Sequence, residues 1–294
     1  EGNNFVKLKR GGSIVGQNGE AREAYIDKIL GFIDLKILKP LKIVINSGNG
    51  AAGPTIDALN CELKNKGVKT NFVYLHHEPD PSFPNGIPNP LIEENRSSTA
   101  DAVIKEKADF GVAFDGDFDR CFLFDHLGKF IPGEYVVGLL AKIFLLKEER
   151  STIVSDPRVI WNTIDIVRKC DGSLVTSKTG HAFMKATMRD VGAVYGGEIS
   201  AHHYFKDFAY CDSGMIPWLM VWQLLSEKEL PLSKLISERA SRFPSSGELN
   251  FTVPDAANCI KMVKSAFAED ATFIDEMDGL SISFENWRFN LRQS

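Results

Sequence analysis

The sequence predicts an α/β protein with two consecutive α/β layer domains with mixed sheets, followed by the start of an α+β C-terminal domain. Short β-branched runs alternate with helical patterns along most of the chain, which is typical of layered α/β units. Glycine-rich or acidic turns follow several of these runs, as they do where strands end in such domains. With 294 residues, 44% of them hydrophobic, the chain can bury more than one core.

The first predicted unit, residues 21–129, alternates strands and helices after an irregular leader at 1–20. Its opening helix carries apolar residues at helical spacing, and β-branched or aromatic runs mark its strands. We expect helices over Ala21–Leu35, Thr55–Asn65 and Ser98–Lys107. We expect strands over Leu41–Asn46, Asn71–Leu75, Asp109–Phe114 and Arg120–Asp125.

The second predicted unit, residues 130–243, repeats the alternation and ends in a strongly apolar helix. Its expected helices are Glu134–Leu146, Ile160–Lys169, Ala182–Val191 and Ser213–Leu225. Its expected strands are Thr152–Ser155, Leu174–Ser177 and Ala193–Tyr195. Phe243–Gly247 is predicted to link this unit to a partial C-terminal domain at 244–294. The chain opens without methionine and closes on the strand-like Trp287–Ser294, so we interpret it as a piece of a longer protein.

Bulk composition limits the classes of partner. The formal net charge of −5 argues against nucleic acid and anionic membranes but allows a small anionic substrate in a local cationic pocket. The five cysteines are scattered without a CxxC pair, which favours a reducing compartment over disulfides or zinc. No apolar run has transmembrane length and no signal peptide is recognisable. We predict a cytoplasmic protein and leave its oligomeric state open.

Three aspartates, Asp115, Asp117 and Asp119, directly follow a predicted buried strand. Alternate side chains of an extended or tightly turned loop project to one side, so these carboxylates are expected to converge. Converging carboxylates repel unless a cation neutralises them, and Mg²⁺ prefers such oxygen ligands. Gly116 permits a sharp backbone path.

Other interpretations of this acidic loop are open. The spacing begins like a calcium EF-hand, but Arg120 stands where the loop glycine belongs and His126 where the bidentate glutamate belongs, which excludes that motif. A strand ending in DxD is also typical of sugar phosphatases with an aspartate nucleophile, here Asp115. A plain solvated acidic turn is the third possibility.

A second polar group, Glu198, Ser200 and His202, alternates along the chain. In an extended segment the three side chains would share a face. A carboxylate and a hydroxyl suit adjacent sugar hydroxyls, and an imidazole can act as a general acid or base. A polar edge strand with a structural histidine fits the same pattern.

Two further segments bear on ligand binding. Lys178 and His181 precede a predicted helix, whose free N–H groups favour an anion. The turn Ser47–Gly53 contains a GxGxxG pattern after a strand, which suggests dinucleotide binding. Pro54, however, has no N–H to offer a phosphate, so we interpret this turn as architecture.

The segment FDGDFDR resembles the metal loop DGDxDR of the α-D-phosphohexomutase family. The resemblance implies that Asp115, Asp117 and Asp119 bind Mg²⁺ and that Arg120 acts catalytically beside the transferring phosphoryl group. It covers nearly the whole chain and implies domains two and three and the beginning of domain four.

GEISAH is similar to the family's sugar loop GEMSGH, with Ile199 and Ala201 in place of the commonest Met and Gly. The resemblance implies that Glu198 and Ser200 bind ring hydroxyls and that His202 contacts the sugar as general acid or base. The continuation His203–Asp212 resembles the bacterial phosphomannomutases that supply GDP-mannose.

KTGH resembles an active-site stretch of the family, which implies that Lys178 is catalytic and His181 binds substrate. Arg158 matches a substrate-facing basic position. Arg292 and Ser294 resemble the start of the phosphate loop RxSNTEP, so Arg292 is expected to be part of a phosphate clamp.

The family's phosphoserine loop, similar to TASHNP, does not occur in the sequence. The resemblance therefore implies that the full-length protein interconverts mannose 6-phosphate and mannose 1-phosphate through a phosphoserine and a bisphosphate intermediate, and that this chain alone is inactive. A phosphoglucomutase or dual-specificity enzyme and a non-catalytic sugar-phosphate-binding module are the alternatives, besides the phosphatase.

Overall fold

The computed structural model describes residues 11–158 and 160–293, without the side chain of Asn18. The first ten residues of the predicted leader, and Ser294 of the predicted phosphate loop, lie outside the described residues. Within that leader, residues 11–17 are exposed and irregular, and helix α1 begins at Asn18.

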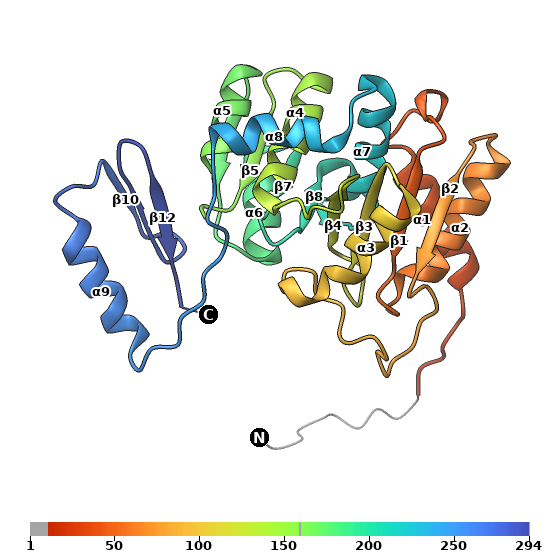
Figure 1. Cartoon of the computed structure of the whole chain (residues 1–294), viewed down its shortest axis with the longest axis horizontal. Helices are drawn as coiled ribbons and strands as arrows, with labels where there is room; N and C mark the ends of the chain where they lie inside the picture. Colours follow the sequence, from red (N-terminus) through yellow and green to blue (C-terminus); the bar gives the residue numbers. More distant parts are fainter. Residues whose placement is uncertain (1–10, 159, 294) are drawn as a thin grey trace.

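The first unit is a four-stranded mixed sheet in the order β2-β1-β3-β4 (Figure 1). The strands are β1 (Lys42–Asn46), β2 (Asn71–Leu75), β3 (Phe110–Phe114) and β4 (Cys121–Asp125). Strand β1 pairs in parallel with β2 and β3, and β4 runs antiparallel to β3. The helices are α1 (Asn18–Leu30), α2 (Ala52–Asn65) and α3 (Ser97–Glu106), with short 3₁₀ turns at Leu35–Ile37 and Glu93–Asn95.

Alternation along the strands decides which helices cover each face of this sheet. Ile43 and Ile45 of β1 belong to the hydrophobic core that contains α1 and α2. Val44, between them, packs with Val103 of α3 and Phe122 of β4. A strand covered on both faces needs apolar residues throughout, which explains the unbroken run that the sequence shows there.

The second unit is a five-stranded mixed sheet in the order β6-β5-β7-β8-β9. The strands are β5 (Thr152–Ser155), β6 (Ser173–Thr176), β7 (Tyr195–Gly197), β8 (His203–Phe205) and β9 (Cys211–Asp212). Strand β5 is parallel to β6 and β7, while β7, β8 and β9 are antiparallel. The helices are α4 (Gly133–Lys147), α5 (Trp161–Lys169), α6 (His181–Val191), α7 (Met215–Lys228) and α8 (Leu232–Arg242), with a 3₁₀ turn at Lys206–Phe208.

Helix α7 joins the two units. Trp218 and Trp222 on this helix are fully buried and belong to the core that contains residues of both sheets. The Trp222 indole N–H donates to the Lys39 carbonyl at 2.8 Å. The prediction of a buried helix over Ser213–Leu225 is therefore confirmed, and this helix fixes the two sheets relative to each other.

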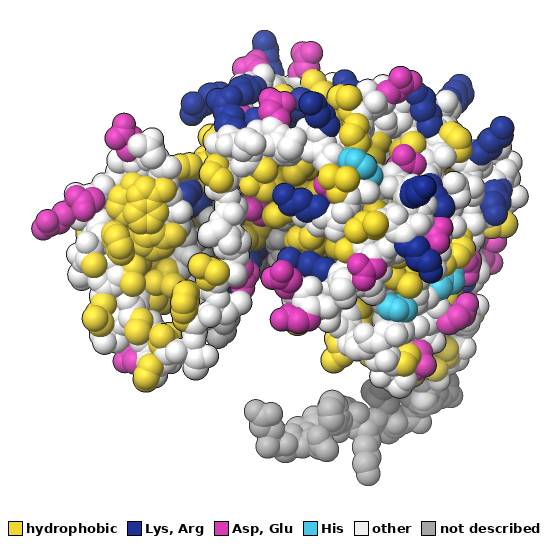
Figure 2. All heavy atoms as spheres, in the orientation of Figure 1, with side chains coloured by type: hydrophobic (Ala, Val, Ile, Leu, Met, Phe, Trp, Pro, Cys, Tyr) yellow, Lys and Arg dark blue, Asp and Glu magenta, His cyan; other side chains and the backbone are white. Residues whose placement is uncertain are grey.

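The C-terminal unit forms a separate lobe (Figure 1). Helix α9 (Ala256–Phe267) packs on an antiparallel sheet of β10 (Phe273–Asp275), β11 (Leu280–Ser283) and β12 (Arg288–Leu291). A notch separates this lobe from the body, and hydrophobic side chains gather on the face of the lobe that the view shows (Figure 2). The described fold is thus α/β with mixed sheets plus a small C-terminal sheet, as predicted.

Most predicted elements differ from the observed ones by a few residues at one or both ends, and two of these differences have a clear physical cause. The first helix ends at Leu30 rather than Leu35, because the chain turns at Gly31 while Phe32 and Ile33 still enter the core. Strand β7 begins at Tyr195 rather than Ala193, because residues 192 and 193 bond back to helix α6 through the Met188 and Arg189 carbonyls. Among the described residues, every helix is too short or too polar to span a bilayer.

Candidate functional site

The acidic loop connects β3 to β4, and its three aspartates converge. One carboxylate oxygen from each of Asp115, Asp117 and Asp119 lies within 4.8 Å of the others. The loop is a tight turn, in which the Phe118 N–H donates to the Asp115 carbonyl at 3.3 Å and Phe118 has a φ of 53°. Asp115 is buried, Asp117 is exposed and Asp119 is intermediate. The spacing predicted that the three carboxylates would lie on one side of the loop, and the observed turn brings them together.

Arg120 neutralises part of this charge. Its Nε donates to Asp115 Oδ2 at 2.6 Å and its backbone N–H donates to Asp115 Oδ1 at 3.2 Å. Burial nevertheless raises the pKa of Asp115 to about 6, because the loss of hydration outweighs the opposing effect of Arg120. The neighbouring His202 imidazole holds the pKa of Asp119 below its usual range.

The acidic loop has the chemistry of a divalent-cation site. Three carboxylates face one another around a single positively charged side chain, so the group carries excess negative charge. Asp119 Oδ1 is buried and has no hydrogen-bond partner among the described residues, which is costly unless something else occupies its lone pairs. Hard oxygen donors of this kind suit Mg²⁺ or Ca²⁺.

The second predicted motif lies in the hairpin between β7 and β8. The expectation of an extended segment is wrong: residues 198–201 form a tight turn closed by bonds from Glu198 N–H to the His202 carbonyl at 2.9 Å and from Ala201 N–H to the Glu198 carbonyl at 3.0 Å. Ala201 has a φ of 72°. Strands β7 and β8 pair antiparallel on either side, and a short connection between them requires a turn.

The turn still brings the three polar side chains together. Ser200 Oγ lies 3.2 Å from Glu198 Oε2 and 3.2 Å from His202 Nδ1. Glu198 is only 1% exposed, and its Oε1 accepts from the Tyr204 hydroxyl at 2.8 Å and the Gly180 N–H at 3.2 Å. The protein itself therefore uses most of the hydrogen-bonding capacity of Glu198, while Ser200 and His202 are partly exposed.

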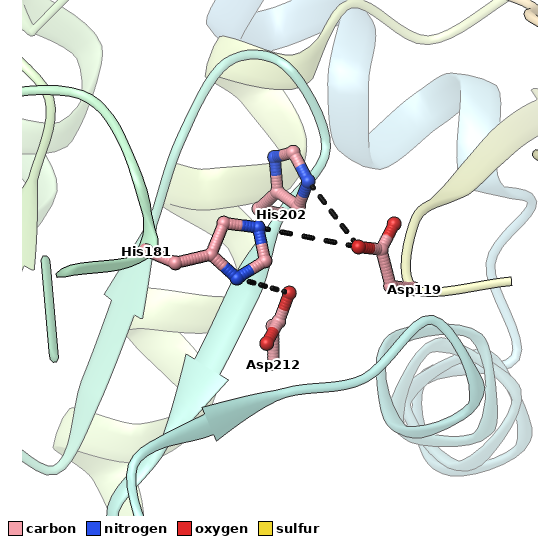
Figure 3. A group of neighbouring side chains, drawn as sticks. All are labelled: Asp119, His181, His202 and Asp212. Carbon is pink, nitrogen blue, oxygen red and sulfur yellow. Dashed lines mark ion pairs between the residues drawn. The ribbon is translucent and has the colours of Figure 1, made fainter. Parts of the chain in front are cut away.

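The two loops meet edge to edge. Arg120 and His202 form an isolated β-bridge, and Asp119 Oδ2 lies 3.7 Å from His202 Nε2 and 4.0 Å from His181 Nε2 (Figure 3). His181 is the first residue of α6, so the KTGH segment enters the same site. Three segments far apart in the sequence thus bring an acidic group, two imidazoles and a hydroxyl together as neighbours.

Three other predicted residues are placed differently. Lys178 is exposed, and its Nζ lies 5.8 Å from the centre of the Phe183 ring. Arg158 is held by Asp156, with Nη2 to Oδ2 at 2.8 Å, and lies 3.9 Å from Glu198 Oε2. Arg292 lies 3.6 Å from Asp278 Oδ2. Among the described contacts, none connects these three side chains to the acidic loop.

Sequence reasoning missed residues that act from outside the motifs. Asp212 lies 3.3 Å from His181 Nδ1, and Tyr204 binds Glu198. Both belong to the segment His203–Asp212, which was singled out only as a resemblance. Asp278 Oδ2 accepts the Thr179 N–H at 3.0 Å, and no local pattern marks that aspartate.

Two family models match the chain. The α/β/α domain II of phosphoglucomutases and phosphomannomutases matches residues 23–128, and domain III of the same family matches residues 132–243. The first match contains the acidic loop, and the second contains the KTGH segment and the β7–β8 turn.

Known relatives are similar over most of the chain. A phosphomannomutase of Salmonella typhimurium is 56% identical over 273 residues, which are 93% of this chain and 60% of the relative. A phosphomannomutase of Vibrio cholerae is 54% identical over 271 residues, 92% of this chain and 58% of the relative. Phosphohexose mutases of Xanthomonas campestris are 50% identical over 273 residues, 93% of this chain and 60% of the relative. The chain spans about three fifths of the length of these relatives.

Solved structures resemble the fold. A phosphoglucomutase/phosphomannomutase family protein of Burkholderia thailandensis has a TM-score of 0.77 at 28% identity. The match covers 93% of this chain and 57% of the Burkholderia chain. The phosphoglucomutase parafusin of Paramecium has a TM-score of 0.69 at 17% identity, covering 90% of this chain and 53% of its own. The second likeness concerns the fold alone.

Proposed function

Because the chain belongs to the phosphoglucomutase/phosphomannomutase family, we propose that it supplies the metal-binding and sugar-binding parts of a phosphomannomutase. The complete protein would interconvert mannose 6-phosphate and mannose 1-phosphate. The observation that carries this proposal is the meeting of the acidic loop with the sugar loop, where Asp119 Oδ2 lies 3.7 Å from His202 Nε2. Phosphoryl transfer depends on positioning and charge neutralisation around the moving group, and this junction offers both.

We propose that Asp115, Asp117 and Asp119 hold Mg²⁺. The cation would neutralise phosphoryl oxygens when bound, and the excess negative charge of the trio supports its binding. Arg120 adds a fixed positive charge, because its guanidinium is oriented by Asp115. The hydrogen bonds from Arg120 to both Asp115 oxygens lower the nucleophilicity of this carboxylate, which counts against the phosphatase alternative, while each oxygen keeps a lone pair for a metal ion.

His202 is proposed as the general acid or base. Its Nδ1 is within hydrogen-bond reach of Ser200 Oγ, so Nε2, which faces Asp119 at 3.7 Å, is the nitrogen available for proton transfer. Ser200 and Glu198 would contact ring hydroxyls, although Glu198 must exchange at least one of its internal hydrogen bonds to do so. His181 and Lys178 are proposed to contact the substrate from the start of α6, with Lys178 among the catalytic residues, and Arg158 and Arg292 to contact its phosphate.

The phosphoryl carrier is proposed to be a serine outside the printed sequence. The family resemblance implies a phosphoserine and a bisphosphate intermediate, and no loop similar to TASHNP occurs in these 294 residues. We therefore propose that this chain alone binds sugar phosphate without turning it over. The Xanthomonas relatives are named phosphohexose mutases, which keeps a dual mannose and glucose specificity as the second candidate.

The proposal extends to organisation and location. We propose domain boundaries at 129/130 and 243/244, close to the family matches at 23–128 and 132–243. We propose a cytoplasmic protein, because five free cysteines are stable in a reducing compartment.

The test is isothermal titration of mannose 1-phosphate and glucose 1-phosphate into the chain, with and without Mg²⁺. Binding should require Mg²⁺ and should be lost in Asp117→Asn and weakened in Ser200→Ala. Phosphorus NMR of the same mixtures should show no conversion of either sugar phosphate. Binding that ignores Mg²⁺ and both substitutions would refute the site, and conversion by the chain alone would refute the proposed need for an outside serine.

A further inference from the structure

A second group of metal-ligating side chains combines Asp119 with three residues from outside the acidic loop. Asp119, His181, His202 and Asp212 each offer a ligand atom, all within 4.8 Å of one another (Figure 3). Asp119 Oδ2 faces His202 Nε2 at 3.7 Å and His181 Nε2 at 4.0 Å. Both distances are too long for hydrogen bonds. Both imidazole nitrogens therefore face Asp119 Oδ2 at ion-pair distance without a hydrogen bond to it.

Both imidazoles are oriented by partners behind them. His181 Nδ1 lies 3.3 Å from Asp212 Oδ2, and His202 Nδ1 lies 3.2 Å from Ser200 Oγ. A proton on each Nδ1 leaves the lone pair of each Nε2 directed toward Asp119. Metal-binding histidines show this pattern, in which an outer carboxylate or hydroxyl fixes the ring and its tautomer.

Asp212 is a partner of this kind. Its side chain is 8% exposed, and its Oδ1 lies 3.3 Å from Lys185 Nζ. Its Oδ2 makes no hydrogen bond of good geometry among the described residues, although it is the oxygen nearest to His181. A buried carboxylate behind a half-exposed imidazole strengthens the ring as a ligand.

We propose that Asp119, His181 and His202 bind a borderline divalent cation such as Zn²⁺ at a site that shares only Asp119 with the Mg²⁺ site of the acidic loop. Zinc bonds of about 2.0–2.1 Å in a tetrahedron place the ligand atoms about 3.4 Å apart, so the two separations from Asp119 Oδ2, of 3.7 Å and 4.0 Å, must close by less than about 1 Å. Imidazole nitrogens favour Zn²⁺, Cu²⁺ and Ni²⁺ over Mg²⁺, whereas the carboxylates of Asp115 and Asp117 favour Mg²⁺. Three protein ligands would leave the fourth position of a tetrahedral cation to water or substrate.

The consequence is inhibition of the mutase by zinc, which rests on the proposed function. A cation on His202 Nε2 removes the nitrogen proposed to move a proton, and it takes Asp119 from the trio that holds Mg²⁺. Zinc bound here would act against catalysis while leaving Asp115 and Asp117 untouched.

The experiment measures the binding of Zn²⁺ and of Mg²⁺ separately, by calorimetry on this chain and four variants. His181→Gln should lower Zn²⁺ affinity by more than about 100-fold, because it removes a ligand, and Asp212→Asn by about 10–100-fold, because it removes an outer partner. Asp117→Asn should weaken Mg²⁺ and leave Zn²⁺ unchanged. His77→Gln is the matched control, since His77 and Asp57 form an isolated pair at 2.9 Å elsewhere, and it should change neither.

The proposal is overturned if Zn²⁺ binds to the carboxylates of the acidic loop instead of the two histidines. Zinc affinity lost in Asp117→Asn but kept in His181→Gln would place Zn²⁺ in the carboxylate trio. The spectrum of bound Co²⁺ provides a readout that needs no variant: a four-coordinate site with nitrogen ligands absorbs visible light strongly, and a purely oxygen-bound octahedral ion absorbs weakly. A weak octahedral spectrum in the unmodified chain would also reject the site. Neither measurement depends on mutase activity, so failure here is distinguishable from failure of the proposed function.

Discussion

The Ala51 N–H donates a hydrogen bond to the Gly116 carbonyl at 2.9 Å. The Gly-rich turn after β1 thereby supports the acidic loop after β3. A Cβ on Gly50 would lie 2.5 Å from the same carbonyl oxygen, so this glycine permits the close approach of the two backbones. The GxGxxG pattern thus has a structural use in this fold that requires no dinucleotide.

Gly50→Ala is expected to displace the acidic loop. The added methyl must push Gly116 away, and overpacking of this kind costs about 1–3 kcal/mol. We expect a lower free energy of unfolding in urea and weaker Mg²⁺ binding by calorimetry, because the spacing of the three carboxylates changes with Gly116.

Gly19→Ala is the control for this substitution. A Cβ at Gly19 would have no neighbour within 4 Å, and alanine favours a helix, so its stability should stay within about 0.5 kcal/mol of the parent chain. Equal behaviour of the two variants would show that the contact of Gly50 with Gly116 has no role in the loop.

The raised pKa of Asp115 predicts a pH-dependent stability of the metal-free chain. The folded state keeps this carboxyl protonated up to about pH 6, whereas the ordinary value is 3.8. Between these values the folded state binds more protons than the unfolded state, so this group makes the free energy of unfolding fall as pH rises. The free energy of unfolding falls through this group by at most about 3 kcal/mol. The fall is fully present once the pH is well above 6.

Asp115→Asn should remove that pH dependence. We expect the variant to be more stable than the parent chain at pH 7.5 in EDTA, with the difference shrinking toward pH 4, measured by urea unfolding at each pH. Asp101→Asn, on the exposed side of α3, should follow the parent profile. An Asp115→Asn curve parallel to the parent curve would contradict the assigned pKa.

Local patterns predicted most of the fold because runs of β-branched and aromatic residues of strand length mark a buried strand such as β5 and also a half-exposed edge strand such as β2. Thr152–Ser155 and Asn71–Leu75 were predicted with the bounds that the structure has. The errors arose where tertiary contacts decide. The short strands β8 and β9 form because they pair in sequence beside β7. Segments of two or three residues are too short for their own sequence to predict a strand.

The site shows the same division. Asp115, Asp117 and Asp119 lie within one loop, so their convergence followed from spacing. The approach of Asp119 to His202 joins two units and depends on the packing of α7, which spacing cannot give. The turn at Ala201 was missed because a non-glycine residue with positive φ gives no signal in sequence.

Tyr204→Phe should destabilise the sugar loop. The Tyr204 hydroxyl donates to the buried Glu198 at 2.8 Å, and removing a donor from a buried carboxylate costs about 1.5–3 kcal/mol. We expect this loss in thermal or urea unfolding, together with weaker binding of mannose 1-phosphate. Tyr210→Phe is the control, because the Tyr210 hydroxyl makes no hydrogen bond among the described residues. Equal stability of the two variants would mean that Glu198 is satisfied without Tyr204.

Asp278 connects the C-terminal lobe to the KTGH segment. Its Oδ2 accepts hydrogen bonds from the Thr179 N–H at 3.0 Å and from the Thr179 hydroxyl, and Arg292 Nη1 lies 3.6 Å from the same oxygen. A second contact, from Arg288 to the Pro157 carbonyl at 2.9 Å, joins the lobe to the loop after β5. Arg288 also donates to the Arg158 carbonyl, so the lobe is held beside the proposed substrate site by the hydrogen bonds of Asp278 and Arg288.

Asp278→Ala should loosen the lobe without unfolding the body. The loss of hydrogen bonds to a carboxylate costs about 1.5–3 kcal/mol. The strands of the two sheets joined by α7 do not bond to the Asp278 carboxylate among the described contacts, so their stability should not depend on it. We expect faster amide hydrogen exchange at Thr179 and faster proteolysis between residues 244 and 254, while the thermal unfolding of the body is unchanged. Glu285→Ala, an exposed position in the same lobe, should leave both rates as they are. Unchanged hydrogen exchange at Thr179 in Asp278→Ala would contradict this prediction. It would mean that the Thr179 N–H is protected without the Asp278 carboxylate and that Arg288 alone holds the lobe in place.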